Sequence, residues 1–209
     1  MSNKINILSP FGPKLAKIKL TKKIIKDINN EVERVILNEK KLRTNDYSKK
    51  LVGEVYQEIE LSKNFINKKL KKFIQEKIKN YLKKTINKTA NKISIKNFWV
   101  VRQFKNEYNP VHYHSGHVSG AGYLKVPKNL GKFIQNKDKQ FQGGDLNLIH
   151  GSRQFLSRSI FPIKPKVGDF YFFPNYLMNT VYPFNGTAEE RRSISFNANI
   201  DEKIFNQVS

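Results

Sequence analysis

The chain has 209 residues, of which 38% are hydrophobic and 12% aromatic, so it is long enough and apolar enough for one domain with a buried core. This composition excludes an intrinsically disordered protein, and no stretch has the apolar length of a membrane span or a signal peptide. We therefore expect a single cytoplasmic domain over residues 1–209 with no membrane partner.

The formal net charge of +22 suggests attraction to a polyanion such as nucleic acid. Lysine supplies most of this charge, whereas arginine, which makes the bidentate contacts to phosphate and guanine, is sparse. A bias toward Lys, Asn and Ile is also expected from AT-rich codons. A nucleic-acid-binding module is thus an alternative that we do not favour, and nothing in the sequence indicates an oligomeric state.

The first part of the chain has the periodicity of helices. Apolar residues recur at helical spacing from Thr21 to about Leu42 and again from Ser62 to Ile86, with Ser62 as a candidate N-cap. Lysines cover the rest of the second stretch, and a solvated face explains them better than a binding patch. Residues 1–92 are therefore predicted to be a mainly helical buttress.

After about Ile93 the pattern changes to short runs rich in β-branched and aromatic residues, separated by Gly, Pro and Asn. Six or so strands are expected over residues 93–200. Helices followed by strands indicate an α+β domain in which the helices cover one face of a barrel or sandwich.

The chain has no cysteine, so any metal must be held by His, carboxylate or amide groups. All four histidines fall between residues 112 and 150, and three lie in the segment NPVHYHSGHVSG. In a strand, His112 and His114 would point to one face and Tyr113 to the other, which gives half of a metal site. The alternative is a histidine pair that only forms hydrogen bonds in a polar cleft.

A second candidate group follows in the segment RRSISFN. On a strand, Arg191 and Ser193 share one face, where a guanidinium and a hydroxyl can hold a carboxylate, and Arg192 faces solvent on the other side. The alternative for this segment is an edge-strand arginine in a surface ion pair with Glu189 or Glu190.

These motifs occur together in a recognisable order: WVVRQF, Asn109-Pro110, HYH, SGxxYLKVP, GDFYFFPNYL, VxPF and ERRSISFN. From roughly Phe98 to Asn197 the chain resembles the 2-oxoglutarate-Fe(II) oxygenase family of marine bacterial and phage type. The resemblance implies a double-stranded β-helix, a jelly-roll or cupin-like barrel, buttressed by the N-terminal helices. It also places the protein in the cytoplasm of a bacterium or of an infected host cell.

The resemblance implies an iron site in which His112 and His114 supply two ligands. The third ligand of the family is a His in the segment FPxxLxHxV, and Asn179 stands at that position here. An amide oxygen is a poorer ligand for Fe(II) than imidazole. His117 and His150 are further candidates for a third nitrogen.

The family's cofactors are Fe(II), the co-substrate 2-oxoglutarate and O₂. Arg191 and Ser193 match the pair that holds the distal carboxylate of 2-oxoglutarate, and Tyr123 is a candidate for an additional hydrogen bond or for core packing. The expected function is an oxygenase that hydroxylates an unidentified substrate. The alternative, which Asn179 favours, is a metal-free jelly-roll protein with a binding or structural role.

Overall fold

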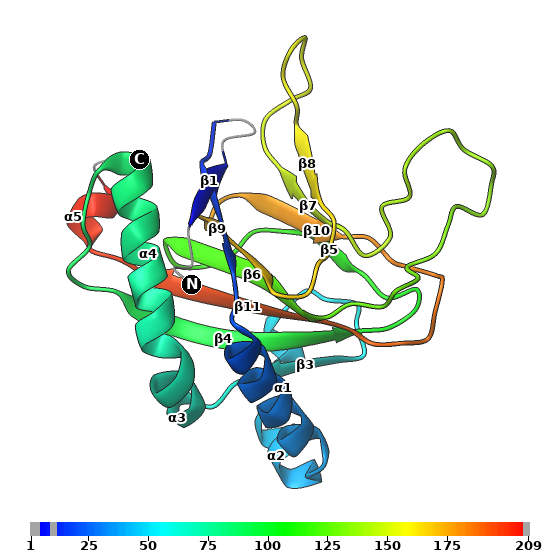
Figure 1. Ribbon diagram of the computed structural model, residues 1–209, viewed down its shortest axis with the longest axis horizontal. Coiled ribbons are helices and arrows are strands. Elements are labelled where there is room, and N and C mark those ends of the chain that lie inside the picture. The colour runs from blue at the N-terminus through cyan, green and yellow to red at the C-terminus, as the bar shows by residue number, and fades with distance from the viewer. Residues whose placement is uncertain (1–4, 9–11, 207–209) are drawn as a thin grey trace.

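Two antiparallel sheets form the centre of the protein in the computed structural model, which describes residues 5–8 and 12–206 (Figure 1). The larger sheet has seven strands in the order β1 (Asn6–Leu8), β2 (Leu15–Lys19), β9 (Asp169–Pro174), β6 (Val118–Lys125), β11 (Arg191–Asn199), β4 (Ser94–Gln103) and β3 (Gln57–Glu60). The smaller sheet has the order β5 (Asn109–His112), β10 (Met178–Val181), β7 (Leu146–Ile149) and β8 (Ile160–Ile163). The α+β class and the jelly-roll arrangement of facing sheets agree with expectation.

Helices cover the outer face of the larger sheet. They are α1 (Lys22–Ile36), α2 (Glu39–Thr44), α3 (Lys63–Phe65), a π-helical turn (Ile66–Leu70), α4 (Lys71–Ile86) and the C-terminal α5 (Glu202–Phe205), with a short 3₁₀ turn at Ser48–Lys50. The buried apolar residues of α1 and α4 belong to one core with the outward-facing residues of β4, β9 and β11. A second, smaller core lies between the two sheets.

The helix boundaries agree with the predicted ones except at one break. Thr21 and Ser62 are N-caps, because their hydroxyl oxygens accept hydrogen bonds from the backbone N–H groups of Ile24 and Phe65, each at 3.2 Å. The single helix predicted from Thr21 to Leu42 is wrong. The chain leaves the helix at Leu37, and Asn38 adopts an extended conformation in which its side-chain oxygen caps α2.

The prediction for residues 1–92 also missed three strands. β1 and β2 extend one edge of the larger sheet, and β3 forms its opposite edge. In β2, Leu15 packs between the sheets while Ala16 and Ile18 face the helices. Strands of three to five residues contain too few alternations to be separated from helix by periodicity.

Two glycines let the larger sheet pack closely against its aromatic core. A Cβ on Gly120 would overlap the ring of Phe196, and one on Gly122 would overlap the ring of Phe170. Both glycines lie on β6, between strands β9 and β11 that carry these rings. The SGxxY motif is therefore explained by packing on the outer face of the sheet and by Tyr123 on its inner face.

Arg192 is fully buried, which corrects the expectation that it faces solvent. It points to the outer face of β11, where its guanidinium contacts Glu190 Oε1 at 2.6 Å, Glu33 Oε1 at 2.8 Å and Asn29 Oδ1 at 3.0 Å. Burial alone would raise the pKa of Glu190, but hydrogen bonds from Arg192 and Arg102 hold it below its usual value. The sequence predicted correctly that Arg192 and Arg191 point to opposite faces of the strand. It did not predict that Arg192 is buried, which is because helix α1 covers its face.

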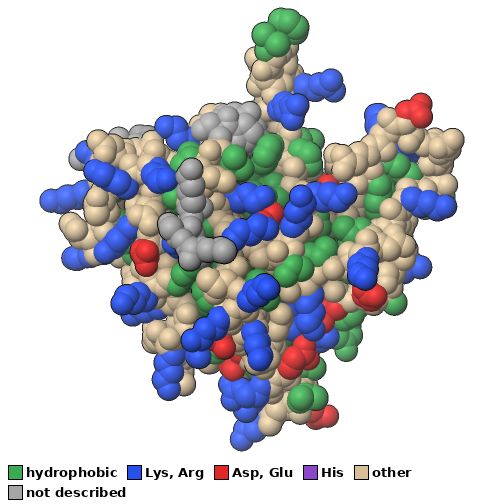
Figure 2. Space-filling model, viewed as in Figure 1, with side chains coloured by type: hydrophobic (Ala, Val, Ile, Leu, Met, Phe, Trp, Pro, Cys, Tyr) green, Lys and Arg blue, Asp and Glu red, His purple; other side chains and the backbone are tan. Residues whose placement is uncertain are grey.

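On the face shown in Figure 2 the positive charge is dispersed. Figure 2 shows lysine and arginine side chains over most of the visible face, without a single dominant cluster. Within residues 5–8 and 12–206, no helix has the length and apolar character needed to cross a membrane.

Replacing Arg192 with Met should destabilise the fold by about 3 kcal/mol, because it leaves the buried carboxylate of Glu190 without its main partner. Urea denaturation followed by circular dichroism measures this change. Arg43→Met is the matched control, since its ion pair with Glu39 is exposed on both sides. Equal midpoints for the two variants would contradict a structural role for Arg192.

Candidate functional site

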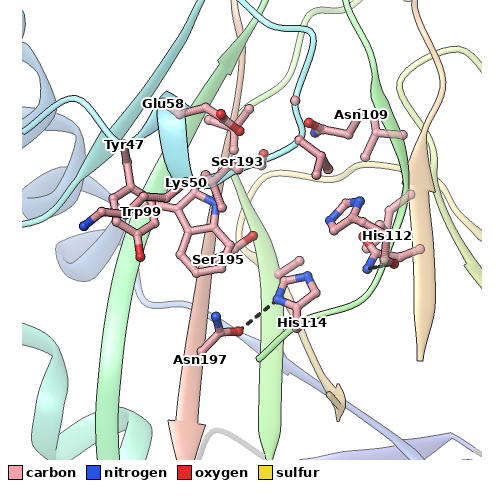
Figure 3. A pocket seen from close by; sticks show the side chains of 18 of the residues that line it. Tyr47, Lys50, Glu58, Trp99, Asn109, His112, His114, Ser193, Ser195 and Asn197 are labelled. Atoms are coloured by element: carbon pink, nitrogen blue, oxygen red, sulfur yellow. Dashed lines mark hydrogen bonds between the residues drawn. The ribbon is translucent and has the colours of Figure 1, made fainter. Parts of the chain in front are cut away.

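A pocket of about 230 Å³ lies between the two sheets (Figure 3). Six residues singled out from the sequence line it: His112, His114, Tyr123, Asn179, Arg191 and Ser193. The inward-facing residues of β4, β6 and β11 form one wall, and β5, β7 and β10 form the other. The structure thus brings together residues that are up to 81 positions apart in the sequence, between 112 and 193.

The two histidines share the pocket but not one strand. β5 ends at His112, and His114 follows it in a segment without regular structure. Their ring centres are 5.5 Å apart, while Tyr113 between them is 72% exposed. The predicted common cavity is confirmed, and the predicted common strand is wrong because the ladder with β10 stops at the pair His112 and Asn179.

Each histidine has one ring nitrogen engaged by a carbonyl oxygen. Nδ1 of His112 is 2.7 Å from the backbone oxygen of Pro110, and Nδ1 of His114 is 3.0 Å from Oδ1 of Asn197. Because these oxygens only accept hydrogen bonds, each Nδ1 carries the proton. The lone pair of the neutral ring is then on Nε2 in both histidines, which is the form that binds metals.

Burial keeps both rings neutral. It lowers the pKa of His112, and it lowers the pKa of His114 to about 4 with a further contribution from the neighbouring His112. At neutral pH both Nε2 lone pairs are therefore available without loss of a proton.

Asn197 holds His114 within a small buried network. Its Oδ1 accepts from Nδ1 of His114 and from the hydroxyl of Ser119 at 3.1 Å, and its Nδ2 donates to Oγ of Ser115 at 3.0 Å. The ring of His114 is also stacked on Trp99, with ring centres 5.7 Å apart. The orientation of His114 is therefore fixed from two sides.

Asn179 lies beside His112 in the smaller sheet. The two residues are register partners, and Nδ2 of Asn179 donates to the backbone oxygen of His112 at 3.2 Å. Asn179 is 3% exposed and lines the pocket, so its Oδ1 is the atom left for a ligand. Its role as a ligand stays a prediction.

The two other histidines do not line this pocket. His117 accepts a hydrogen bond from the backbone N–H of Ile200 at 3.1 Å and stacks on Phe205 of α5, on another part of the surface. His150 lies near Tyr176, with ring centres 6.5 Å apart. Neither supplies a third nitrogen to the pair in this conformation.

The donor set can hold Fe(II), but it contains no charged ligand. Two imidazole nitrogens and one amide oxygen are acceptable donors for this ion, and an all-neutral set binds it more weakly than one with a third imidazole or a carboxylate. Among the described residues, no group of three or more His, Cys, Asp and Glu side chains is placed to hold a metal. The set that the sequence predicts, His112, His114 and Asn179, therefore stays a prediction for a metal in this pocket.

The other end of the pocket offers an anion site. Arg191 is 1% exposed, its Nε donates to the backbone oxygen of Gly144 at 3.0 Å, and its Nη1 lies 3.4 Å from Oγ of Ser193. In the described part of the chain no carboxylate lies within ion-pair distance of this guanidinium, and Asp145 acts on it only from farther away. The alternative of a surface ion pair is therefore wrong for Arg191.

Tyr123 completes this end of the pocket. The guanidinium of Arg191 lies over its ring at 5.1 Å, and its buried hydroxyl has no hydrogen-bond partner among the described residues. A buried cation next to an unpaired hydroxyl is costly to maintain unless an anionic ligand satisfies both. The carboxylate of 2-oxoglutarate has the charge and the acceptors that this arrangement requires.

The structure adds pocket residues that the sequence did not single out for a role, among them Glu58, Trp99, Asn109 and Asn197. Trp99, Asn109 and Asn197 stand in the quoted motifs, so their alternation with buried neighbours was the available signal. Glu58 carried no signal, because its short strand lies in a region predicted to be helical.

Comparison with known families agrees with a pocket for Fe(II) and 2-oxoglutarate. The model of the family described as "Putative 2OG-Fe(II) oxygenase" matches residues 97–197, which include every site residue named above except Glu58. No curated protein sequence matches the chain.

Several solved structures share the fold at low sequence identity. A viral collagen prolyl hydroxylase from Paramecium bursaria Chlorella virus-1, solved as a 2OG complex, is 17% identical with a TM-score of 0.53, covering 88% of this chain and 94% of its own. A Pseudomonas putida prolyl-4-hydroxylase is 14% identical with a TM-score of 0.54, covering 94% and 93%. A Trichoplax adhaerens prolyl hydroxylase in complex with a hypoxia inducible factor peptide is 14% identical with a TM-score of 0.53, covering 100% and 88%. These likenesses show the double-stranded β-helix fold.

Replacing Asn197 with Leu should weaken metal binding about 10- to 100-fold, because His114 loses the acceptor that fixes its tautomer and orientation. Anaerobic Fe(II) titration measures the affinity, and ¹⁵N NMR of the metal-free protein reports which ring nitrogen carries the proton. Asn197→Asp keeps an acceptor and should restore both readouts. Full affinity in the Leu variant would show that Asn197 does not position the ligand.

Replacing Asn179 with His should tighten Fe(II) binding by about tenfold, or about 1.4 kcal/mol, because imidazole is the stronger donor. Met178→His is the matched control, since that neighbour on β10 is 42% exposed and is not among the pocket residues. Anaerobic Fe(II) titration compares both with the wild type. An unchanged affinity in Asn179→His, with tight binding by the wild type, would mean that another residue completes the site.

Proposed function

We propose that the chain is a 2OG-Fe(II) oxygenase, the family whose model matches residues 97–197, and that its pocket binds Fe(II) and 2-oxoglutarate and hydroxylates a substrate at the mouth of the barrel. The observation that carries the proposal is the fully buried Arg191, which forms no ion pair among the described residues and lies beside the unsatisfied hydroxyl of Tyr123. Hydrogen bonds to Gly144 and Ser193 orient this guanidinium but bring no negative charge to it, so its burial is costly unless a ligand supplies the counter-charge.

In the proposed site, Arg191 and Tyr123 bind the distal carboxylate of 2-oxoglutarate, and Ser193 adds a hydroxyl from the same strand. Arg191 is oriented for this by Gly144, whose carbonyl oxygen accepts from Nε and leaves the terminal nitrogens for the ligand. Leu146 and Val181 from the smaller sheet close the pocket with apolar side chains that exclude water.

At the other end of the pocket, His112 and His114 present their Nε2 lone pairs and Asn179 presents its amide oxygen. The bound ion, with 2-oxoglutarate and O₂, supplies the oxidising chemistry of the family. The protein's own contribution is to fix the two rings through Pro110 and Asn197 and to keep them unprotonated.

The substrate is unidentified. Peptides belong among the candidates because three of the solved structures with this fold are prolyl hydroxylases, one of them bound to a peptide. Loops between the strands decide specificity in such folds, and their sequence here does not name a substrate.

A metal-free binding protein is the second candidate function. Asn179 favours it, because the described residues offer two imidazoles and no carboxylate to the metal. The intact pair of Arg191 and Ser193 argues against it, because this pair matches the residues that hold 2-oxoglutarate in the family. Metal binding is the direct test between the two candidates.

We expect the wild type to bind Fe(II) anaerobically and to develop the weak visible charge-transfer band of the chelate only when 2-oxoglutarate is also present. Arg191→Met should weaken 2-oxoglutarate binding about 10- to 100-fold and leave the affinity for Fe(II) alone unchanged, because charged hydrogen bonds are lost at the far end of the pocket.

Arg153→Met, an exposed arginine in the β7–β8 connection, is the matched control and should behave as the wild type. Circular dichroism checks that Arg191→Met is folded, and Arg191→Lys, which keeps the charge but not the fork, should show an intermediate loss. Absence of the band in the wild type at saturating ligand would favour the metal-free binding protein.

A further inference from the structure

Glu58 is a buried acid that neither the iron site nor the co-substrate site uses. It lies on the edge strand β3 and is paired in register with Val101 on β4, which is paired with Ser193 on β11. Because neighbouring strands are about 4.8 Å apart, its backbone is roughly 10 Å from that of Ser193. Glu58 therefore lines a part of the pocket that Arg191 and Ser193 leave open, across the cavity from His112 in Figure 3.

The side chain of Glu58 has no structural partner. It is 2% exposed, and its Oε2 makes no hydrogen bond within the described part of the protein, where no cation pairs with it either. Glu190, by contrast, has a structural role in this fold, because Arg102 and Arg192 both bind its carboxylate. Burying an unsatisfied carboxyl group costs stability, so its retention calls for a partner from outside.

Burial, together with the negative charge of Asp46, raises the pKa of Glu58 to about 8, so the uncharged acid predominates at neutral pH. A protonated carboxyl group carries one O–H donor and one carbonyl acceptor side by side.

The surroundings of Glu58 are polar on one side and aromatic on the other. Oε1 of Glu58 and Oδ1 of Asn109 lie 2.7 and 2.5 Å from the point that a Cβ on Gly53 would occupy, so the two oxygens converge where the chain has no side chain. Tyr47 and Trp99, with ring centres 6.0 Å apart, form the adjoining wall. Asn109 is on the same strand as His112, which puts this polar pair next to the histidines.

We propose that Glu58 and Asn109 form a substrate subsite that binds an uncharged amide, with Glu58 as the specificity-determining residue. This inference rests on the proposed oxygenase function, whose substrate class it names. The protonated carboxyl group of Glu58 donates to the amide oxygen, Oδ1 of Asn109 is the acceptor offered to an N–H of the ligand, and the flat amide packs on the wall of Tyr47 and Trp99.

The alternative of a cationic group is less consistent with the pocket. The ammonium of Lys50 already lies over the ring of Tyr47 at 5.0 Å, and the protein as a whole carries a net charge of +22. Both oppose the approach of a second cation.

The experiment uses Trp99 as its reporter, because it is the single tryptophan of the chain and lines the pocket. The probes are a panel of N-acetyl amino-acid amides, and each is paired with the same amino-acid amide without the acetyl group, which carries an ammonium. Tryptophan fluorescence titrations are made without metal, so that amide binding is measured apart from turnover. The variants are Glu58→Gln, Glu58→Ala and Glu60→Gln, the last a control on the same strand outside the pocket.

We expect at least one acetylated amide to bind the wild type more tightly than its ammonium counterpart. Glu58→Gln, which keeps a donor and an acceptor, should bind it within about threefold of the wild type, and Glu58→Ala should lose about tenfold. Glu60→Gln should match the wild type, and 2-oxoglutarate affinity should be the same in all four proteins.

No binding of any acetylated amide to the wild type would overturn the proposal, and so would equal affinity in Glu58→Ala. Tighter binding of the ammonium probes, together with an equal loss of affinity in Glu58→Gln and Glu58→Ala, would show that Glu58 binds a cation instead. If the wild type binds neither Fe(II) nor 2-oxoglutarate, the oxygenase function is contradicted. The amide titration is a separate measurement, so its result does not depend on that outcome.

Discussion

The alternation of side chains along β11 is the constraint on which the rest of the structure depends. Arg191, Ser193, Ser195 and Asn197 line the pocket, and Arg192, Ile194, Phe196 and Ala198 between them face the helix-covered side. One strand therefore provides the anion clamp, the support of His114 and the centre of the aromatic core. A shift of one residue in its register would exchange all of these at once, which explains why β11 is paired along its length with both β4 and β6.

Some buried polar and charged groups are paired on the outer face of this sheet, and others are unpaired on its inner face. On the outer face, Arg192 and Glu190 neutralise each other, and Arg102 and Glu33 complete the network. On the inner face, Arg191, Tyr123 and Glu58 are buried without such partners. Paired groups stabilise the fold, whereas unpaired ones lower its stability and gain their partners only from a ligand. This contrast supports a ligand-binding role for Arg191, Tyr123 and Glu58, which line the pocket.

Periodicity predicted those parts of the site that depend on one segment. The spacing of Arg191 and Ser193 requires a common face in any strand, and the two helices with their caps at Thr21 and Ser62 follow from local pattern. The burial of Arg192 could not be predicted, because it depends on helix α1, more than 150 residues earlier, packing over that face. Glu58 was missed for a related reason: a four-residue strand shows its inner face only when β4 is beside it.

The proposed metal site has no charged ligand, and this links the two ends of the pocket. Two imidazoles and an amide leave the charge of Fe(II) uncompensated, and no carboxylate of the described pocket residues is placed to offset it, since Glu58 is itself protonated at neutral pH. The anion held by Arg191 is then the component that brings negative charge to the metal. Because linkage is reciprocal, an ion that is held more tightly in the presence of 2-oxoglutarate also holds 2-oxoglutarate more tightly. In the proposed site, with Asn179 in place of His, Arg191 and Ser193 would thus contribute to metal retention as well as to co-substrate binding, and this dependence would make a weakened ligand set compatible with an intact carboxylate site.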